Sequence, residues 1–70
     1  MSDTIAVTIN GTRRHLATGA TVHTMLEEVL GPGRAGIAVA VNGAVVPESL
    51  ADRPLAAGDQ IEILTAIRGG

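Results

Sequence analysis

The chain has 70 residues, which is enough for one small domain and too few for two, and 46% of them are hydrophobic, so it does not resemble a disordered segment. It has no cysteine for disulfides or thiolate metal sites and no aromatic residue for stacking on nucleic-acid bases. The net charge of -2 gives no basic surface for binding phosphate groups. The first four residues are not basic, as those of a signal peptide would be, and no apolar run is long enough to span a membrane. We therefore expect a cytoplasmic protein that binds neither nucleic acid nor membrane.

The first predicted element is a β-hairpin. Residues 5–9 place β-branched aliphatic side chains at alternate positions, and Asn10-Gly11 is the dipeptide best suited to the two positive φ angles of a type I′ turn. The return strand, 12–16, has three consecutive basic side chains that a central strand could not bury without partners. These are Arg13, Arg14 and His15. We expect this strand at the edge of a sheet.

An amphipathic helix is predicted over 22–30. Its apolar side chains recur at the spacing i, i+3, i+4, i+7 and i+8, which places them in one stripe that can cover a sheet face. They are Val22, Met25, Leu26, Val29 and Leu30. Thr21 is the expected N-cap, and Gly31-Pro32 is expected to end the helix, because glycine adopts a positive φ and proline cannot continue the helix.

A second hairpin is predicted after the helix. Residues 37–41 alternate bulky aliphatic side chains with Ala38 and Ala40, which gives the strand one shallow side suited to a partner. Asn42-Gly43 repeats the turn signal, and 44–46 should pair back as a short strand that ends at Pro47, because proline cannot donate to a ladder.

The last third of the chain is predicted to be irregular until its final strand. Within 48–60, we expect Leu50 and Leu55 to close the open end of the core. Residues 61–65 alternate apolar and polar side chains and can lie beside the first strand at the centre of the sheet. The element order predicts an α+β fold in which a mixed five-stranded sheet packs on one helix.

The usual catalytic constellations are missing from the sequence. It has no cysteine nucleophile, GxSxG elbow, phosphate-binding Walker loop or HExxH zinc motif. We expect His15 to be an exposed edge-strand residue and His23 a first-turn helix residue, neither of them a ligand, because no carboxylates cluster with them in the sequence. Glu27 and Glu28 should lie on a solvated helix face. Asp59 should cap its own turn and bind no metal. We therefore predict neither a metal site nor an enzymatic active site.

The remaining candidate site is the end of the chain, Gly69-Gly70. Two residues without Cβ before a carboxylate form a thin thread that can enter a narrow tunnel and approach a nucleotide. As an acyl adenylate, this carboxylate becomes an electrophile that a persulfide can convert to a thiocarboxylate. The five residues counted as lysine or arginine are all arginines, so neither lysine nor cysteine can capture the activated end. A compositional bias toward arginine explains the same fact equally well.

With these residues in place, the sequence resembles the sulfur carrier proteins of bacterial thiamine biosynthesis, the ThiS family of the ubiquitin-like β-grasp superfamily. The resemblance spans nearly the whole chain. The motifs are Ile9-Asn10-Gly11, Gly19-Ala20-Thr21-Val22, Val39-Ala40-Val41-Asn42-Gly43, Val45-Val46-Pro47, Gly58-Asp59-Gln60-Ile61-Glu62-Ile63 and Thr65-Ala66-Ile67-Arg68-Gly69-Gly70.

The resemblance implies one β-grasp domain over 1–70, monomeric when free, with a flexible tail over about 66–70. It implies that the Gly70 carboxylate is adenylated by a ubiquitin-activating-type enzyme that uses ATP and Mg²⁺. Sulfur would then come from a cysteine desulfurase or another persulfide donor and pass to thiazole synthase. The chain itself would bind no cofactor. Gly69 would thread the tail, and the implied partner-binding residues are Ile67, Arg68, Leu64, Ala38 and Ala40.

Several alternatives stay open. Family members often have a basic and an aromatic residue soon after the proline, whereas Pro47 is followed here by Glu48, Ser49 and Leu50. A carrier for molybdopterin or cysteine synthesis would use the same diglycine chemistry. A ubiquitin-like modifier conjugated through Gly70 to lysines of other proteins, and a purely structural interaction domain, are the alternatives from other classes.

Overall fold

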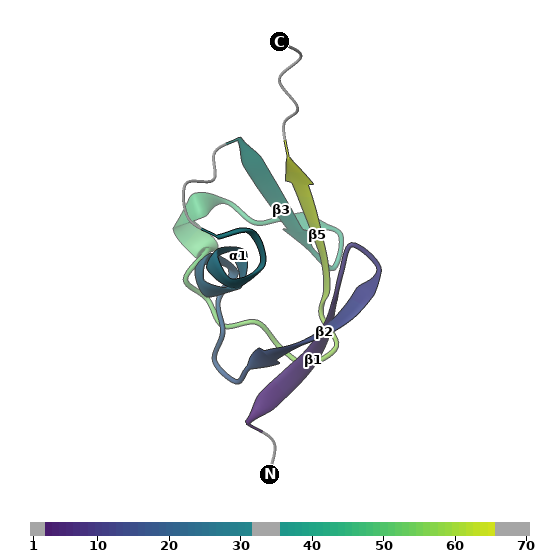
Figure 1. Cartoon of the computed structure of the whole chain (residues 1–70). Coiled ribbons are helices and arrows are strands. Elements are labelled where there is room, and N and C mark those ends of the chain that lie inside the picture. Colours follow the sequence, from purple (N-terminus) through teal and green to yellow (C-terminus); the bar gives the residue numbers. More distant parts are fainter. Residues whose placement is uncertain (1–2, 32–35, 66–70) are drawn as a thin grey trace.

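The computed structural model describes residues 3–31 and 36–65. In this part of the chain, five strands form one sheet of order β2-β1-β5-β3-β4, and one helix packs across a single face of it (Figure 1). The elements are β1 (Thr4–Ile9), β2 (Thr12–Ala17), α1 (Val22–Leu30), β3 (Ile37–Val41), β4 (Ala44–Val45), the 3₁₀ helix η1 (Glu48–Leu50) and β5 (Gln60–Thr65). The predicted α+β fold and the central position of the last strand beside the first are confirmed. The predicted tail, 66–70, lies outside the described residues.

Both hairpins close with the predicted Asn-Gly turns. Asn10 has φ 51° and Gly11 has φ 84°, and the same pair of values, 52° and 84°, recurs at Asn42 and Gly43. Two successive positive φ angles are those of a type I′ turn, whose twist matches that of the flanking strands. β5 then lies between the two hairpins, parallel to β1 and antiparallel to β3.

The core lies between α1 and one face of the sheet, which we call the inner face. Alternation along each strand directs every second side chain toward the helix, and Leu16, Met25 and Ile61 are almost fully buried. The other members of the core are Val7, Ile9, Val22, Leu26, Val39, Ala51, Leu55 and Ile63. Leu30 differs from the prediction: as the last helical residue it is 42% exposed, at the rim of a hollow beside Val29. None of the described helices has the length and hydrophobicity of a membrane span.

The two ends of α1 are defined by the predicted residues. The Thr24 N–H donates to the Thr21 hydroxyl at 3.2 Å, and the Thr21 N–H donates to the Thr24 hydroxyl at 2.8 Å. This reciprocal capping box satisfies donors that the first helical turn leaves free, and the Thr24 half of it was not foreseen. At the other end, Gly31 has φ 81° and donates its N–H to the Glu27 carbonyl at 3.0 Å.

The segment between β4 and β5 corrects one core prediction. Leu55 is buried as expected, but Leu50 is 37% exposed. Ala51, at 4% exposure, occupies the core position that was expected for Leu50. The physical reason is the 3₁₀ turn over 48–50, which brings Ala51 against the helix, where its carbonyl accepts the His23 N–H at 3.2 Å. Leu55 is fixed by a 2.7 Å bond from its own N–H to the Ala20 carbonyl.

Candidate functional site

The predicted site residues fall into two groups. Gly69 and Gly70, together with Ile67 and Arg68, lie outside the described residues. The other three are described, and the structure brings them together on the sheet face that points away from α1, which we call the outer face. They are Leu64, Ala38 and Ala40.

The register of three neighbouring strands builds an apolar patch on the outer face. Ala38 lies opposite Leu64, and Ala40 lies opposite Val45 on the other side of β3. Leu64 is 62% exposed and Val45 is 72% exposed, although both have large apolar side chains. We call these four residues the outer patch. Sequence reasoning missed Val45, and the pairing of 44–46 with 37–41 was the signal that could have found it.

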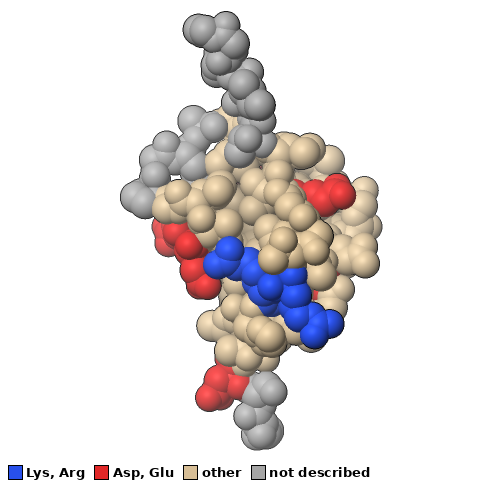
Figure 2. All heavy atoms as spheres, turned by 45° about the vertical axis from the view of Figure 1, so that its right-hand side comes forward, with Lys and Arg blue, Asp and Glu red and all other residues tan. Residues whose placement is uncertain are grey.

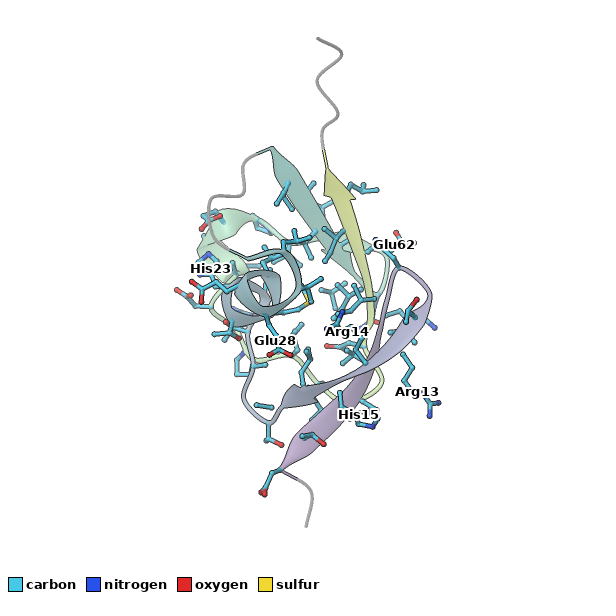
Figure 3. The ribbon with its side chains drawn as sticks, in the orientation of Figure 1. Arg13, Arg14, His15, His23, Glu28 and Glu62 are labelled. Atoms are coloured by element: carbon cyan, nitrogen blue, oxygen red, sulfur yellow. The ribbon has the colours of Figure 1, made fainter. Side chains whose placement is uncertain are left out.

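Glu62 borders the outer patch, whereas Arg13 and Arg14 lie on β2, at the opposite edge of the sheet from β4. Glu62 of β5 lies opposite Ala40 and is exposed. On edge strand β2, Arg13 and Arg14 occupy opposite faces of the sheet, and Figure 3 shows Arg13 pointing away from the helix and Arg14 toward it. Neither arginine forms an ion pair within the described ranges. Figure 2 shows basic atoms in one band across the surface, with acidic atoms to either side.

The asparagine of each turn binds the backbone of β5 with its side chain. The Asn10 Oδ1 accepts the Ile63 N–H at 2.8 Å, and the Asn10 Nδ2 donates to the Ile63 carbonyl at 3.3 Å. The Asn42 Oδ1 accepts the Gln60 N–H at 2.9 Å, and its Nδ2 donates to the Asp59 carboxylate at 3.0 Å. β5 is therefore held near both ends by side chains that the sequence analysis had assigned only to turns.

Asp59 has the structural role that its sequence context predicted. Its Oδ2 accepts the Ala56 N–H at 2.8 Å, which caps the turn that leads into β5, while Oδ1 accepts from Asn42. The Gly58 N–H of the same turn donates to the Ala6 carbonyl at 2.7 Å. Both carboxylate oxygens of Asp59 therefore accept hydrogen bonds from within the chain.

His23 lies in the first turn of α1, as predicted, but two carboxylates that the sequence did not place near it contact its ring. Its Nε2 lies 2.7 Å from a Glu48 carboxylate oxygen, and its Nδ1 lies 2.8 Å from one of Asp52. The hydrogen bond with Glu48, followed by the one with Asp52, raises the pKa of His23 above 6.5, because both stabilise the protonated ring. The two carboxylates contact opposite ring nitrogens, so the three groups do not converge on one point, and no described cluster is arranged to hold a metal ion.

The remaining charged residues singled out in the sequence are exposed as predicted. His15 lies on the β2 edge, and Glu27 and Glu28 lie on the solvated side of α1. Glu28 and His15 are labelled in Figure 3, where they come from separate elements. None of the three forms an ion pair with another described residue.

Comparisons with known proteins agree with this architecture. The sequence model of the ThiS family matches residues 7–70. No curated protein sequence matches the chain. The crystal structure of the thiamine biosynthesis protein ThiS from Geobacter metallireducens is similar to it, with a TM-score of 0.76 and 23% identity over 94% of this chain and 100% of that one. That likeness establishes the shared ubiquitin-like fold, and the family match covers almost every residue. The chain therefore belongs to the ThiS family, the small ubiquitin-like sulfur carriers of thiamine biosynthesis.

Proposed function

We propose that the Gly70 carboxylate is the group that carries sulfur. The observation that supports this most directly is the extent of the family match, which includes both terminal glycines and ends at Gly70. A sulfur carrier works with an activating enzyme and with sulfur-transfer partners, and a terminal carboxylate needs such activation because it is a poor electrophile.

The proposed chemistry has three steps. The Gly70 carboxylate attacks the α-phosphorus of ATP on a ubiquitin-activating-type enzyme, which forms an acyl adenylate and releases pyrophosphate, with Mg²⁺ balancing the phosphate charge. A persulfide from a cysteine desulfurase or another donor then attacks the acyl carbon and displaces AMP. A thiol finally reduces the S–S bond of this acyl disulfide and leaves the thiocarboxylate. Thiazole synthase is the proposed acceptor of that sulfur.

The outer patch is the proposed docking face for the activating enzyme. Its large exposed apolar residues, Leu64 and Val45, give a partner the kind of surface that it can bury with a gain in free energy. Leu64 precedes Gly70 by six residues, and an extended chain of that length spans at most about 22 Å. An enzyme that holds the patch must therefore place its nucleotide within about 22 Å of Leu64. Ile67 and Arg68 are the proposed contacts along the thread.

Intact mass measures this function directly. The full chain is incubated with its cognate activating enzyme, ATP, Mg²⁺ and a persulfide donor, and the expected product has one oxygen replaced by sulfur. Deletion of Gly70 should abolish the change, while the circular dichroism spectrum stays the same because a terminal residue contributes little packing. Gly70→Ala keeps the carboxylate but adds a Cβ, so it tests the need for a thin thread.

The possible results separate the proposed functions. The activating enzyme is shown to be active on another carrier. If the mass of this chain then stays unchanged with that enzyme, the proposal is overturned. Isopeptide adducts of high mass in a cell lysate would favour a protein modifier, and a purely structural domain would give neither product. Adding thiazole synthase and its other substrates, or instead the precursor of molybdopterin or of cysteine, shows which pathway consumes the thiocarboxylate.

A further inference from the structure

We infer that Asn10 is a positioning residue, whose side chain fixes the register of β5 at Ile63 and thereby the position of Thr65, the last described residue before the segment that carries Gly70. This inference rests on the proposed function of Gly70. Asn10 belongs to a turn that is remote in sequence from the end of the chain, and it precedes Ile63 by 53 positions. Its effect on the reaction would act through β5 and not through contact with a substrate.

The side chain of Asn10 continues a ladder that the β1 backbone leaves incomplete. The register between β1 and β5 ends at Ile9 and Ile61, and the Asn10 N–H then donates to the Ile61 carbonyl at 2.9 Å. Beyond that point the chain turns away at Asn10-Gly11. The Asn10 amide has an acceptor and a donor like those of a peptide group, and it uses both on Ile63, at 2.8 and 3.3 Å. It therefore replaces the next peptide unit of β1.

The position of this contact matters because alternate residues of β5 face opposite sides of the sheet. Ile63 is 8% exposed and belongs to the core, whereas the next residue, Leu64, is 62% exposed and belongs to the outer patch. A slip of one residue would exchange these environments and move the end of β5 at Thr65 by about 3.3 Å. A contact that holds the N–H and the carbonyl of Ile63 therefore opposes the slip two residues before that end.

Asn42 provides a matched control within the same fold. It has the same turn geometry, with φ 52° against 51° for Asn10, and its side chain also makes two hydrogen bonds near β5. Those bonds go to Asp59 and to Gln60, at the other end of the strand. Glycine suits the first central position of a type I′ turn, so Asn10→Gly and Asn42→Gly each keep the turn and remove two bonds.

Amide hydrogen exchange of the free full-length chain, followed by NMR, tests the structural part. Asn10→Gly should accelerate exchange at the Ile63 amide about tenfold, because local opening no longer breaks two hydrogen bonds. Asn42→Gly should accelerate exchange at Gln60 and leave Ile63 within about twofold of the wild-type rate. Asn10→Asp keeps an acceptor for the Ile63 N–H but loses the donor, so an intermediate rate is expected, and it replaces Asn10→Gly if that variant does not fold.

Steady-state activation by the cognate enzyme tests the positioning part, at a temperature where every variant is folded. The outer patch is intact in both glycine variants, so KM should stay within about twofold, whereas misplacement of the reacting carboxylate should lower the kcat of Asn10→Gly about tenfold. Asn42→Gly should keep both constants within about twofold.

Equal effects of the two variants, or unchanged exchange at Ile63, would overturn the inference. A wild-type chain that is never adenylated would instead refute the proposed function, and the exchange experiment still decides whether Asn10 holds β5.

Discussion

Successive residues of β5 lie in two different environments. Ile61 and Ile63 face α1 and are 1% and 8% exposed, whereas Glu62 lies on the outer face in the solvent and Leu64 is 62% exposed there. The same alternation holds in β3, where Val39 is buried on the inner face. In a protein this small, one strand therefore provides part of the only described core and part of the candidate recognition surface.

The difference between the two faces separates the requirements of folding from those of recognition. Inner residues are selected by volume and shape, because a close-packed core tolerates few changes. Outer residues make few contacts within the chain, so their identity can vary with little effect on the free energy of unfolding. An apolar side chain left exposed there, such as Leu64 or Val45, is not explained by stability and points to a partner.

Truncation of the inner face should give the largest effect on stability. Ile61→Ala removes a side chain that is 1% exposed and leaves a cavity, so the free energy of unfolding should fall by about 2–5 kcal/mol. This is a large part of the roughly 5–15 kcal/mol typical of small domains. Urea denaturation followed by circular dichroism measures it. Glu62→Ala, the next residue on the outer face, should stay within about 0.5 kcal/mol. Equal losses in the two variants would refute the division between the faces.

Truncation of the outer patch should have the opposite pattern. Leu64→Ala and Val45→Ala should each weaken binding to the activating enzyme about tenfold, as expected for exposed apolar side chains that a partner buries. The free energy of unfolding should change by less than about 0.5 kcal/mol. Isothermal titration calorimetry measures the affinity.

Leu30→Ala is the matched control for the outer patch. Leu30 is also a partly exposed leucine, at 42%, but it lies at the end of α1 on the other side of the sheet. Its truncation should leave the affinity for the activating enzyme unchanged. A loss of affinity as large as that of Leu64→Ala would show that the outer patch is not the specific docking face.

The fold could be predicted because its signals are local. Asn10-Gly11 and Asn42-Gly43 define two turns by the φ angles that they adopt. Thr21 caps the helix through a residue only three positions further along the chain. The alternation in 37–41 and 61–65 then assigns the inner and outer faces. From these faces, the grouping of Ala38 and Leu64 follows once the order of the strands is known.

The features that sequence reasoning missed depend on residues that only the folded chain brings together. The Asn10 amide meets Ile63 across 53 positions, and His23 meets Asp52 across 29. No spacing rule connects a turn asparagine to a strand so far along the chain. The Leu50 prediction failed for a related reason: the 3₁₀ turn over 48–50 decides which neighbouring apolar residue points inward, and hydrophobicity alone favoured the larger one.

A third region, the contact between α1 and η1, lies on neither face of the sheet and should give the smallest effect. His23 binds Glu48 and Asp52 there, and these hydrogen bonds raise the pKa of His23 above 6.5 in the folded chain. A raised pKa means that the contact stabilises the folded chain fully below pH 6.5 and that this stabilisation is lost as the pH rises through the folded-state pKa. The effect is small because the carboxylates are 86% and 85% exposed and water screens the pairs.

His23→Gln should therefore lower the urea midpoint of unfolding below pH 6.5, and the difference from wild type should shrink at alkaline pH. His15→Gln, on the β2 edge without a described side-chain partner, is the control, and a difference for His23→Gln that grew with pH would contradict the assignment.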